Sequence, residues 1–215
     1  MLTIALALAS YLLGAVPFGL LIGCARGVDV RQHGSGNIGA TNVGRVLGRP
    51  WGLLCLALDV LKGFVPTFAA SFLLARPPID AWALVQWIFI AAAAVLGHTF
   101  PVYLQFRGGK GVATTIGVAL GIYPYFAVPM IASLLVYAVL RYATGIVSVG
   151  SLSLALTFPL AVWGYMRYAS LPGDRFWPLP AVAALLGLLI VVRHHANIAR
   201  LFRGQETGPT EPTSG

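Results

Sequence analysis

Long apolar segments with almost no charge recur along this chain, at residues 2–24, 51–75, 81–97, 112–123, 125–140, 145–165 and 177–192. A helix needs about 20 predominantly apolar residues to cross a bilayer, and most of these segments approach that length. Only 9% of the 215 residues are charged, whereas soluble domains carry about a quarter, so the chain lacks the polar surface of a soluble globule. The sequence therefore predicts an all-α integral membrane protein, built as a bundle of transmembrane helices.

The number of crossings depends on residues 112–140. Residues 112–123 would span only about 18 Å as a helix, and Pro124 separates them from the next apolar run. This stretch forms either one kinked span or two short helices. Seven crossings with the N-terminus outside place ten basic loop residues inside and three outside, whereas six crossings give eight and five. Because Lys and Arg collect on the cytoplasmic side, we expect about seven helices, with the C-terminus in the cytoplasm.

Seven crossings also bring the unusual polar segments to one side of the membrane. Six crossings would separate them, so a site built from several of them exists only with seven. We expect a single transmembrane domain at residues 1–206. The composition from Gly204 onward predicts a disordered and dispensable polar tail, placed at residues 207–215. The polar segments are residues 26–50, 98–111, 141–151 and 193–206.

The segment from His33 to Arg45 has the composition of an anion-binding loop. Its glycines can adopt positive φ, which lets successive backbone N–H groups converge on one anion. Side-chain donors accompany them, together with an arginine whose planar guanidinium suits phosphate. A flexible polar loop is the alternative, but this density of donors favours phosphate binding. The candidate residues are Gly34, Ser35, Gly36, Asn37, Gly39, Thr41, Asn42 and Arg45.

A second glycine-rich segment places a lysine just before an apolar run that we expect to be helical. The N-terminus of a helix favours anions through its free N–H groups and its dipole. The segment is not a nucleotide P-loop, because Leu104 and Gly111 stand where that pattern needs Gly and Ser or Thr. A cytoplasmic anchor is the alternative to phosphate contact. The candidate residues are His98, Gly108, Gly109, Lys110 and Gly111.

Three smaller features complete the set of candidates. Ser148 lies one turn before Ser151 at a helix start, a pattern that usually serves helix packing. His194 and Asn197 share a helix face. Adjacent histidines on a helix point apart, and no carboxylate or thiol cluster joins them, so we expect neither a metal nor another cofactor.

Asp59 and Lys62 are charged residues inside an apolar span. Such residues are rare in membranes and usually functional. Because they lie three residues apart on a helix, they can neutralise each other. Either they form an ion pair that supports the site, or they take a direct part in it.

The net charge of +8 does not indicate nucleic-acid binding, because the basic residues lie between apolar runs and not on one soluble face. Such charge suits anionic head groups and phosphate-bearing substrates. The His-x4-Asp pair of many phospholipid acyltransferases is absent, since no acidic residue stands five positions after any histidine. Many phosphate donors, few bases and access to the membrane together suit an acyl phosphate, a mixed anhydride with a good leaving group.

Three motifs resemble those of the acyl-phosphate-dependent glycerol-3-phosphate acyltransferases, the bacterial PlsY family. They are Gly34–Asn42, Gly97-His98 with Gly108–Gly111, and Arg193-His194 with Asn197-Ile198 and Arg200; Asp59–Gly63 is similar as well. The resemblance covers the chain up to Glu206. One departure is Ile38, where the family often has Pro, which should alter the stiffness of the loop more than its chemistry.

The resemblance implies a seven-span enzyme of the bacterial inner membrane with a cytoplasmic active site. The reaction is acyl transfer from acyl phosphate to the 1-hydroxyl of sn-glycerol 3-phosphate, giving lysophosphatidic acid and phosphate, the first step of phospholipid synthesis. The implied partners are both substrates, membrane lipid and the soluble enzyme that makes acyl phosphate. An organic-anion or phosphate-ester transporter is the alternative, although it should show internal symmetry and several polar residues at mid-membrane.

The resemblance also implies roles for individual residues. The loop at Gly34–Asn42 would hold the phosphate of the acyl phosphate, with Ser35 donating. Arg45 and Lys110 would bind phosphate groups, Ser148 would contact substrate, and His194 and Asn197 would help to bind glycerol 3-phosphate. We expect direct attack without a covalent enzyme intermediate, with the proton taken either by His194 or by the departing phosphate.

Overall fold

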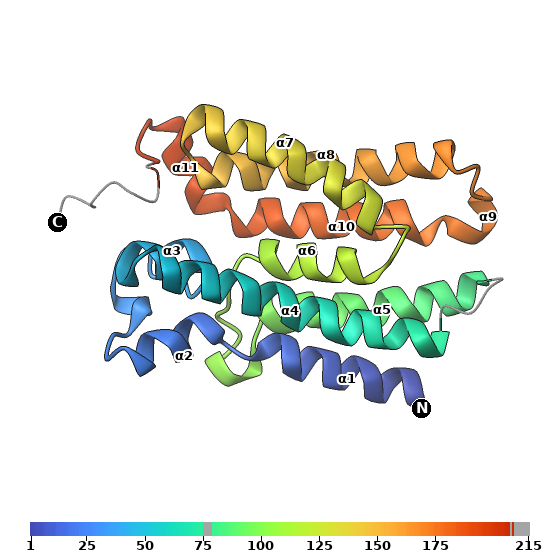
Figure 1. Ribbon diagram of the computed structural model, residues 1–215, viewed down its shortest axis with the longest axis horizontal. Coiled ribbons are helices and arrows are strands. Elements are labelled where there is room, and N and C mark those ends of the chain that lie inside the picture. Colours follow the sequence, from blue (N-terminus) through green and yellow to red (C-terminus); the bar gives the residue numbers. More distant parts are fainter. Residues whose placement is uncertain (75–78, 207, 209–215) are drawn as a thin grey trace.

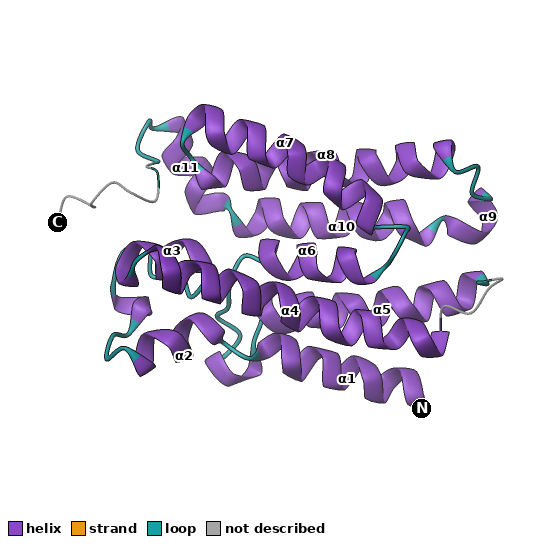
Figure 2. Cartoon of the chain, in the orientation of Figure 1, coloured by secondary structure: helices purple, strands orange, loops and turns teal. Residues whose placement is uncertain are grey.

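The computed structural model describes residues 1–74, 79–206 and 208, and all regular secondary structure in this part of the chain is helical (Figure 2). The order of the elements is α1 (Leu2–Ala15), α2 (Phe18–Ala25), η1 (Val30–Gln32), α3 (Ala40–Leu47), α4 (Arg49–Leu74), α5 (Ala81–Thr99), η2 (Val102–Leu104), α6 (Val112–Gly121), α7 (Ala127–Thr144), α8 (Val147–Tyr168), α9 (Gly173–Phe176), α10 (Pro178–Arg193) and α11 (His195–Phe202).

Six apolar stretches in the described residues are long enough to cross a membrane. The first combines α1 and α2, and the others contain α4, α5, α7, α8 and α10. Many large apolar side chains on these helices are exposed, as they are when lipid surrounds a bundle. The prediction of an all-helical membrane protein is confirmed. The predicted tail at residues 207–215 lies outside the described residues, apart from Gly208.

The first apolar stretch is broken, where the sequence predicted one continuous helix. α1 ends at Ala15 and α2 begins at Phe18, because Pro17 has no N–H to continue the helix. The ammonium of Lys62 on α4 donates to the carbonyl of Val16 at 2.8 Å. A backbone acceptor freed by the break is therefore satisfied inside the bundle.

The short helix α6 runs through the middle of the bundle. Figure 1 shows it between a layer formed by α1, α4 and α5 and a layer formed by α7, α8 and α10. Glycines allow α4 and α6 to touch: a Cβ atom on Gly117 would lie 2.0 Å from the carbonyl oxygen of Val60. Thr114 also donates to the carbonyl of Asp59 at 3.1 Å. A helix of ten residues is tolerable at membrane depth because protein surrounds it.

The chain passes along the bundle through α6 and returns through α7. Val112 at the start of α6 and Val147 at the start of α8 line the same cavity. The start of α1 and the end of α11 lie at opposite ends of the bundle (Figure 1). The four polar segments therefore meet at one end, as the seven-crossing arrangement requires. Which side of the membrane this end faces stays a prediction.

Candidate active site

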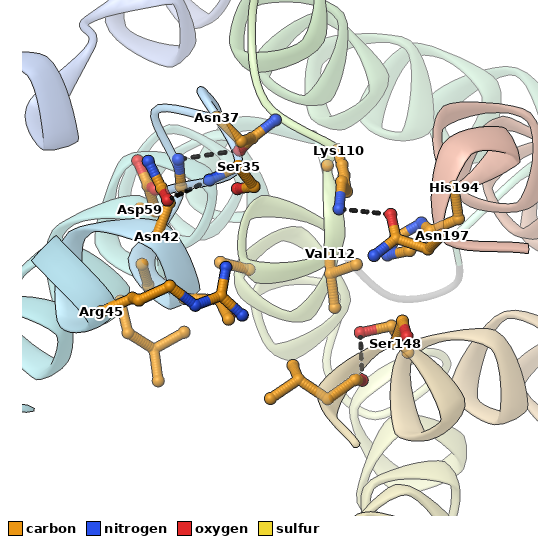
Figure 3. A pocket seen from close by; sticks show the side chains of 18 of the residues that line it. Ser35, Asn37, Asn42, Arg45, Asp59, Lys110, Val112, Ser148, His194 and Asn197 are labelled. Atoms are coloured by element: carbon orange, nitrogen blue, oxygen red, sulfur yellow. Dashed lines mark hydrogen bonds between the residues drawn. The ribbon is translucent and has the colours of Figure 1, made fainter. Parts of the chain in front are cut away.

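A cavity of about 430 Å³ lies where the polar segments converge. One part of its wall is polar, and Figure 3 shows Arg45, Lys110, Ser148 and Asn197 around a common space. The other part is apolar and comes mainly from α4, α6, α7 and α8. The apolar lining residues are Leu56, Val112, Ala113, Ile116, Leu134, Tyr137 and Val147.

The loop before α3 is shaped by the amide of Asn42, which is only 1% exposed. Its Oδ1 accepts from the backbone N–H of Ser35 at 2.8 Å, and its Nδ2 donates to the carbonyls of Val30 and His33. Gly34 and Gly36 adopt φ of 58° and 67°, as the glycine pattern predicted. Asn42 therefore builds the loop through contacts within the protein, and the exposed Ser35 is presented at the cavity.

Arg45 extends from α3 toward the middle of the cavity (Figure 3). Its Nε is buried and has no hydrogen-bond partner among the described residues. Buried polar groups are normally hydrogen-bonded, so an unpaired guanidinium nitrogen beside a cavity indicates an anionic ligand.

Lys110 is held by a tight turn between α5 and α6. The N–H of Gly108 donates to the carbonyl of Thr99, and that of Gly109 donates to the carbonyl of His98. A Cβ on Gly109 would lie 2.2 Å from the His98 ring, so glycine is needed there. Gly111 then adopts φ of 86° directly before α6, and this confirms the predicted position of the lysine at a helix start. Burial lowers the pKa of Lys110 to about 8.

A buried ion pair lies behind this turn. Lys62 Nζ lies 2.7 Å from Asp59 Oδ1, and both side chains are almost fully buried. Asp59 Oδ1 lies 3.7 Å from His98 Nδ1, while the His98 ring packs on Gly109. Asp59 and His98 also line the cavity, whereas Lys62 does not. The geometry therefore favours the supporting interpretation of the Asp59–Lys62 pair.

The last motif folds as a break between two helices. α10 ends at Arg193 and α11 begins at His195, which leaves His194 between them. The ring Nδ1 of His194 donates to the carbonyl of Ile190 at 2.7 Å. Because a carbonyl can only accept, this contact leaves Nε2 as the free ring nitrogen. Burial and the nearby charge of Lys110 lower the pKa of His194 to about 4, so the ring is neutral near pH 7.

A hydrogen-bond network joins the motifs to the start of the predicted tail. Lys110 Nζ donates to Asn197 Oδ1 at 2.6 Å. Glu206 accepts from Asn197, from Ser148 at 2.8 Å and from Arg200 at 2.6 Å. Burial opposes ionisation of Glu206, but these hydrogen bonds hold its pKa below the usual value. The composition from Gly204 onward suggested disorder, but in the structure Gln205 and Glu206, at the end of the predicted domain of residues 1–206, line the cavity. That residues 207–215 are dispensable stays a prediction.

Comparison with known proteins agrees with this geometry. Residues 4–204 match the model of a protein family described as "Glycerol-3-phosphate acyltransferase". The chain is 46% identical over 200 residues to the glycerol-3-phosphate acyltransferase of Anaeromyxobacter dehalogenans (strain 2CP-C), covering 92% of each chain. It is also 46% identical over 200 residues to that of Desulfotalea psychrophila, covering 93% of this chain and 94% of the relative. The chain belongs to the glycerol-3-phosphate acyltransferase family.

Solved structures of this family have the same fold. The crystal structure of PlsY, an integral membrane glycerol 3-phosphate acyltransferase in its glycerol 3-phosphate form, superimposes with a TM-score of 0.82 at 37% identity. The match covers 97% of this chain and 96% of that one. The lysophosphatidic acid form gives a TM-score of 0.80 at 36% identity. The resemblance seen in the motifs is confirmed, and this chain is a multi-pass membrane acyltransferase.

The fold of this acyltransferase brings together most of the predicted residues. Those that line the cavity are Gly34, Ser35, Asn37, Gly39, Thr41, Asn42, Arg45, Asp59, His98, Lys110, Gly111, Ser148, His194 and Asn197. Four predicted residues do not line it: Gly36, Gly108, Gly109 and Lys62. The three glycines shape the backbone of the turns that carry their neighbours, and Lys62 neutralises Asp59.

Five polar residues that line the cavity were not among the predicted site residues: Tyr137, Ser151, Arg200, Gln205 and Glu206. Glu206 was taken as the end of the domain, although a carboxylate thirteen residues after Arg193 could have suggested an internal partner. Arg200 lies one turn after Asn197, and that spacing signalled a shared face. No sequence pattern predicted that Tyr137 and the apolar wall line the cavity, because the direction of these side chains depends on how α6 and α7 pack.

Proposed function

We propose that this chain transfers an acyl group from acyl phosphate to the 1-hydroxyl of sn-glycerol 3-phosphate, releasing lysophosphatidic acid and phosphate. The observation that carries the proposal is the divided cavity, with cationic and hydrogen-bonding groups at one part of the wall and an apolar surface at the other. A phosphate-bearing head group and an acyl chain need these two environments side by side. The glycerol 3-phosphate and lysophosphatidic acid forms of the PlsY structure support the choice of acceptor and product.

Two phosphate groups must be held at once in this reaction. The loop from Gly34 with Arg45 offers one set of donors, and Lys110 at the start of α6 with Arg200 offers another. We assign the acyl phosphate to the first set and glycerol 3-phosphate to the second, which Ser148, His194 and Asn197 complete. The acyl chain then lies along the apolar wall. Holding both reactants in this way lowers the activation barrier by several kcal/mol.

Direct attack on the acyl carbonyl fits the side chains present. Within the described residues no serine hydroxyl is hydrogen-bonded to a histidine, and the Ser148 hydroxyl donates to Glu206. An activated nucleophile of the usual kind is therefore lacking. In the proposed step the glycerol oxygen bonds to the carbonyl carbon, the carbon–oxygen bond to phosphate breaks, and phosphate leaves with the electron pair. Donors of the loop and Arg45 stabilise the developing charge.

The hydroxyl proton has two candidate acceptors: His194 and the departing phosphate. His194 is neutral near pH 7 with Nε2 free, so it can accept a proton, but its low pKa makes it a weaker base than an ordinary histidine. If it acts as the base, His194→Ala removes almost all turnover while glycerol 3-phosphate still binds. Turnover that returns at high glycerol 3-phosphate assigns the proton to the phosphate.

We also propose that the protein lies in a bacterial inner membrane with this cavity at the cytoplasmic face. The basic residues of the polar segments gather at the end of the bundle that holds the cavity, which supports this orientation. A cytoplasmic opening also suits delivery of acyl phosphate by the soluble enzyme that makes it.

The test is phosphate release by purified protein supplied with palmitoyl phosphate, with and without glycerol 3-phosphate, and without metal, ATP or acyl-CoA. We expect release that depends on glycerol 3-phosphate and is matched by lysophosphatidic acid. Release without the acceptor would indicate a phosphatase. No release from folded protein in detergent, with anion uptake in sealed vesicles, would favour the transporter.

A further inference from the structure

A second cavity, of about 580 Å³, lies on the other side of the glycine loop. Asn37 lines both cavities, so the loop forms the wall between them. Gly36 and Gly108, which do not line the first cavity, line this one, and so does Arg193 of the last motif. The side chain of Arg193 and the backbones of Gly36 and Gly108 therefore face a space other than the acyl-transfer cavity.

Three arginines line the second cavity: Arg31, Arg107 and Arg193. Arg193 is fixed, because its guanidinium donates to the carbonyl of Gly108 at 2.9 Å and lies over the ring of Phe100. Arg31 is paired with Asp29 at 2.7 Å. Among the described residues, no carboxylate lies within ion-pair distance of Arg107 or Arg193. The cavity therefore carries uncompensated positive charge.

The loop that presents Arg107 is closed on itself. The N–H of Phe106 donates to the carbonyl of Pro101 at 2.9 Å, and that of Arg107 donates to the carbonyl of Leu104 at 3.0 Å. Tyr11 also donates to the carbonyl of Phe100 at 2.7 Å, which ties the loop to α1. A guanidinium on a fixed backbone loses less freedom when it binds an anion.

The rim of this cavity has the character of a membrane boundary. The loop follows an apolar stretch that ends at Leu104. Tyr103 and Phe106 line the cavity and are 55% and 60% exposed. Aromatic residues beside arginine at the end of a span are typical of the layer where lipid phosphates lie.

We propose that the second cavity binds a phosphate-bearing anion at the membrane boundary, separately from the cavity assigned to acyl transfer. Two sources share this chemistry, the head group of an anionic lipid and free phosphate. The cavity volume falls in the range of small-molecule sites, and arginine forks match phosphate oxygens. Since binding can be measured without turnover, the inference does not depend on the proposed reaction.

The experiment uses the full chain with Lys110→Ala. This substitution weakens anion binding in the first cavity and leaves the lining of the second unchanged. Phosphate binding is measured by equilibrium dialysis in phosphatidylcholine nanodiscs. Retention of phosphatidylglycerol is measured by native mass spectrometry. Adding Arg107→Gln should lower the affinity for either phosphate or phosphatidylglycerol by roughly tenfold or more. Arg203→Gln is the control, because Arg203 is exposed and lines neither cavity.

A variant of opposite sign separates charge from folding. Asp29→Asn frees Arg31 and should tighten the same binding, whereas Arg31→Gln should weaken it. Loss of phosphate binding alone identifies free phosphate, and loss of phosphatidylglycerol alone identifies the lipid. If Arg107→Gln matches Arg203→Gln for both ligands, the proposal is overturned. Melting temperatures check each variant, and Arg31→Gln replaces Arg107→Gln if the latter is destabilised.

Discussion

At the scale of single residues, the site depends on how the fold changes the protonation of Lys110 and His194. Burial lowers the pKa of both groups, to about 8 and about 4. The consequences differ, because phosphate binding uses the charged form of Lys110 and base catalysis would use the neutral form of His194. Near pH 7 each side chain is in the form that its proposed role requires.

The first prediction concerns Lys110 and pH. Lys110 is charged below its pKa of about 8 and neutral above it, whereas a phosphate monoester is already dianionic above about pH 6. We therefore expect kcat/KM for glycerol 3-phosphate to fall as pH rises through 8, approaching tenfold per pH unit. Lys110→Arg should keep the value level to about pH 10, because arginine stays charged. A kcat/KM profile from pH 6 to 10 measures both, and an unchanged fall in Lys110→Arg would assign it to another group.

At the scale of elements, α6 holds its place through close contact with α4. A Cβ on Gly117 would meet Val60 and Phe64, and one on Gly63 would meet Thr114. These contacts fix the start of α6 and therefore Lys110, so the packing of a short helix is linked to the polar end of the cavity.

Gly117→Ala should lower stability by about 1–3 kcal/mol, since the backbone of α4 cannot move away from an added methyl group. Gly164→Ala on α8 is the matched control, because no atom of another helix lies within 4 Å of its added Cβ. That variant should be neutral or slightly stabilising. Thermal unfolding in detergent compares the two, and equal melting temperatures would mean that α6 does not depend on this contact.

The start of the C-terminal segment is also an element of the site. Glu206 accepts hydrogen bonds from three side chains of two other segments. Removing residues 207–215 should leave activity within about twofold, whereas removing residues 204–215 should lower it at least about tenfold, because each lost contact to a charged group is worth about 1.5–3 kcal/mol. The measurement is the activity of each truncated protein, normalised to the amount of folded protein. Loss in the shorter deletion would give residues 207–215 a role.

At the scale of the whole molecule, the orientation in the membrane can be tested with the native cysteines. Cys24 is exposed at the end of α2, whereas Cys55 is fully buried. A membrane-impermeant maleimide should label Cys24 in inside-out vesicles and not in right-side-out vesicles. Cys24→Ser should abolish labelling in both. Labelling only from the outside would reverse the predicted topology.

Much of the architecture could be predicted from the sequence, because hydropathy and charge act locally along a membrane chain. The apolar runs predicted the long helices to within a few residues. Of the glycines in the His33–Arg45 loop, Gly34 and Gly36 adopt the positive φ that the pattern indicated, whereas Gly39 does not. The position of Lys110 at a helix start followed from the same kind of local rule. The break at Pro17 was missed, although proline carries the signal.

The sequence by itself determined that this chain lies in a membrane, which segments are polar, and which motifs place it in its family. Only the tertiary structure decided which motif residues face which cavity, since a side chain's direction depends on helix packing. It turned Asn42 into the support of a loop, assigned Arg193 to a second cavity and placed Glu206 at the site. The sequence placed Glu206 at the end of the domain without a partner, because a hydrogen bond across 58 residues leaves no trace in a local pattern.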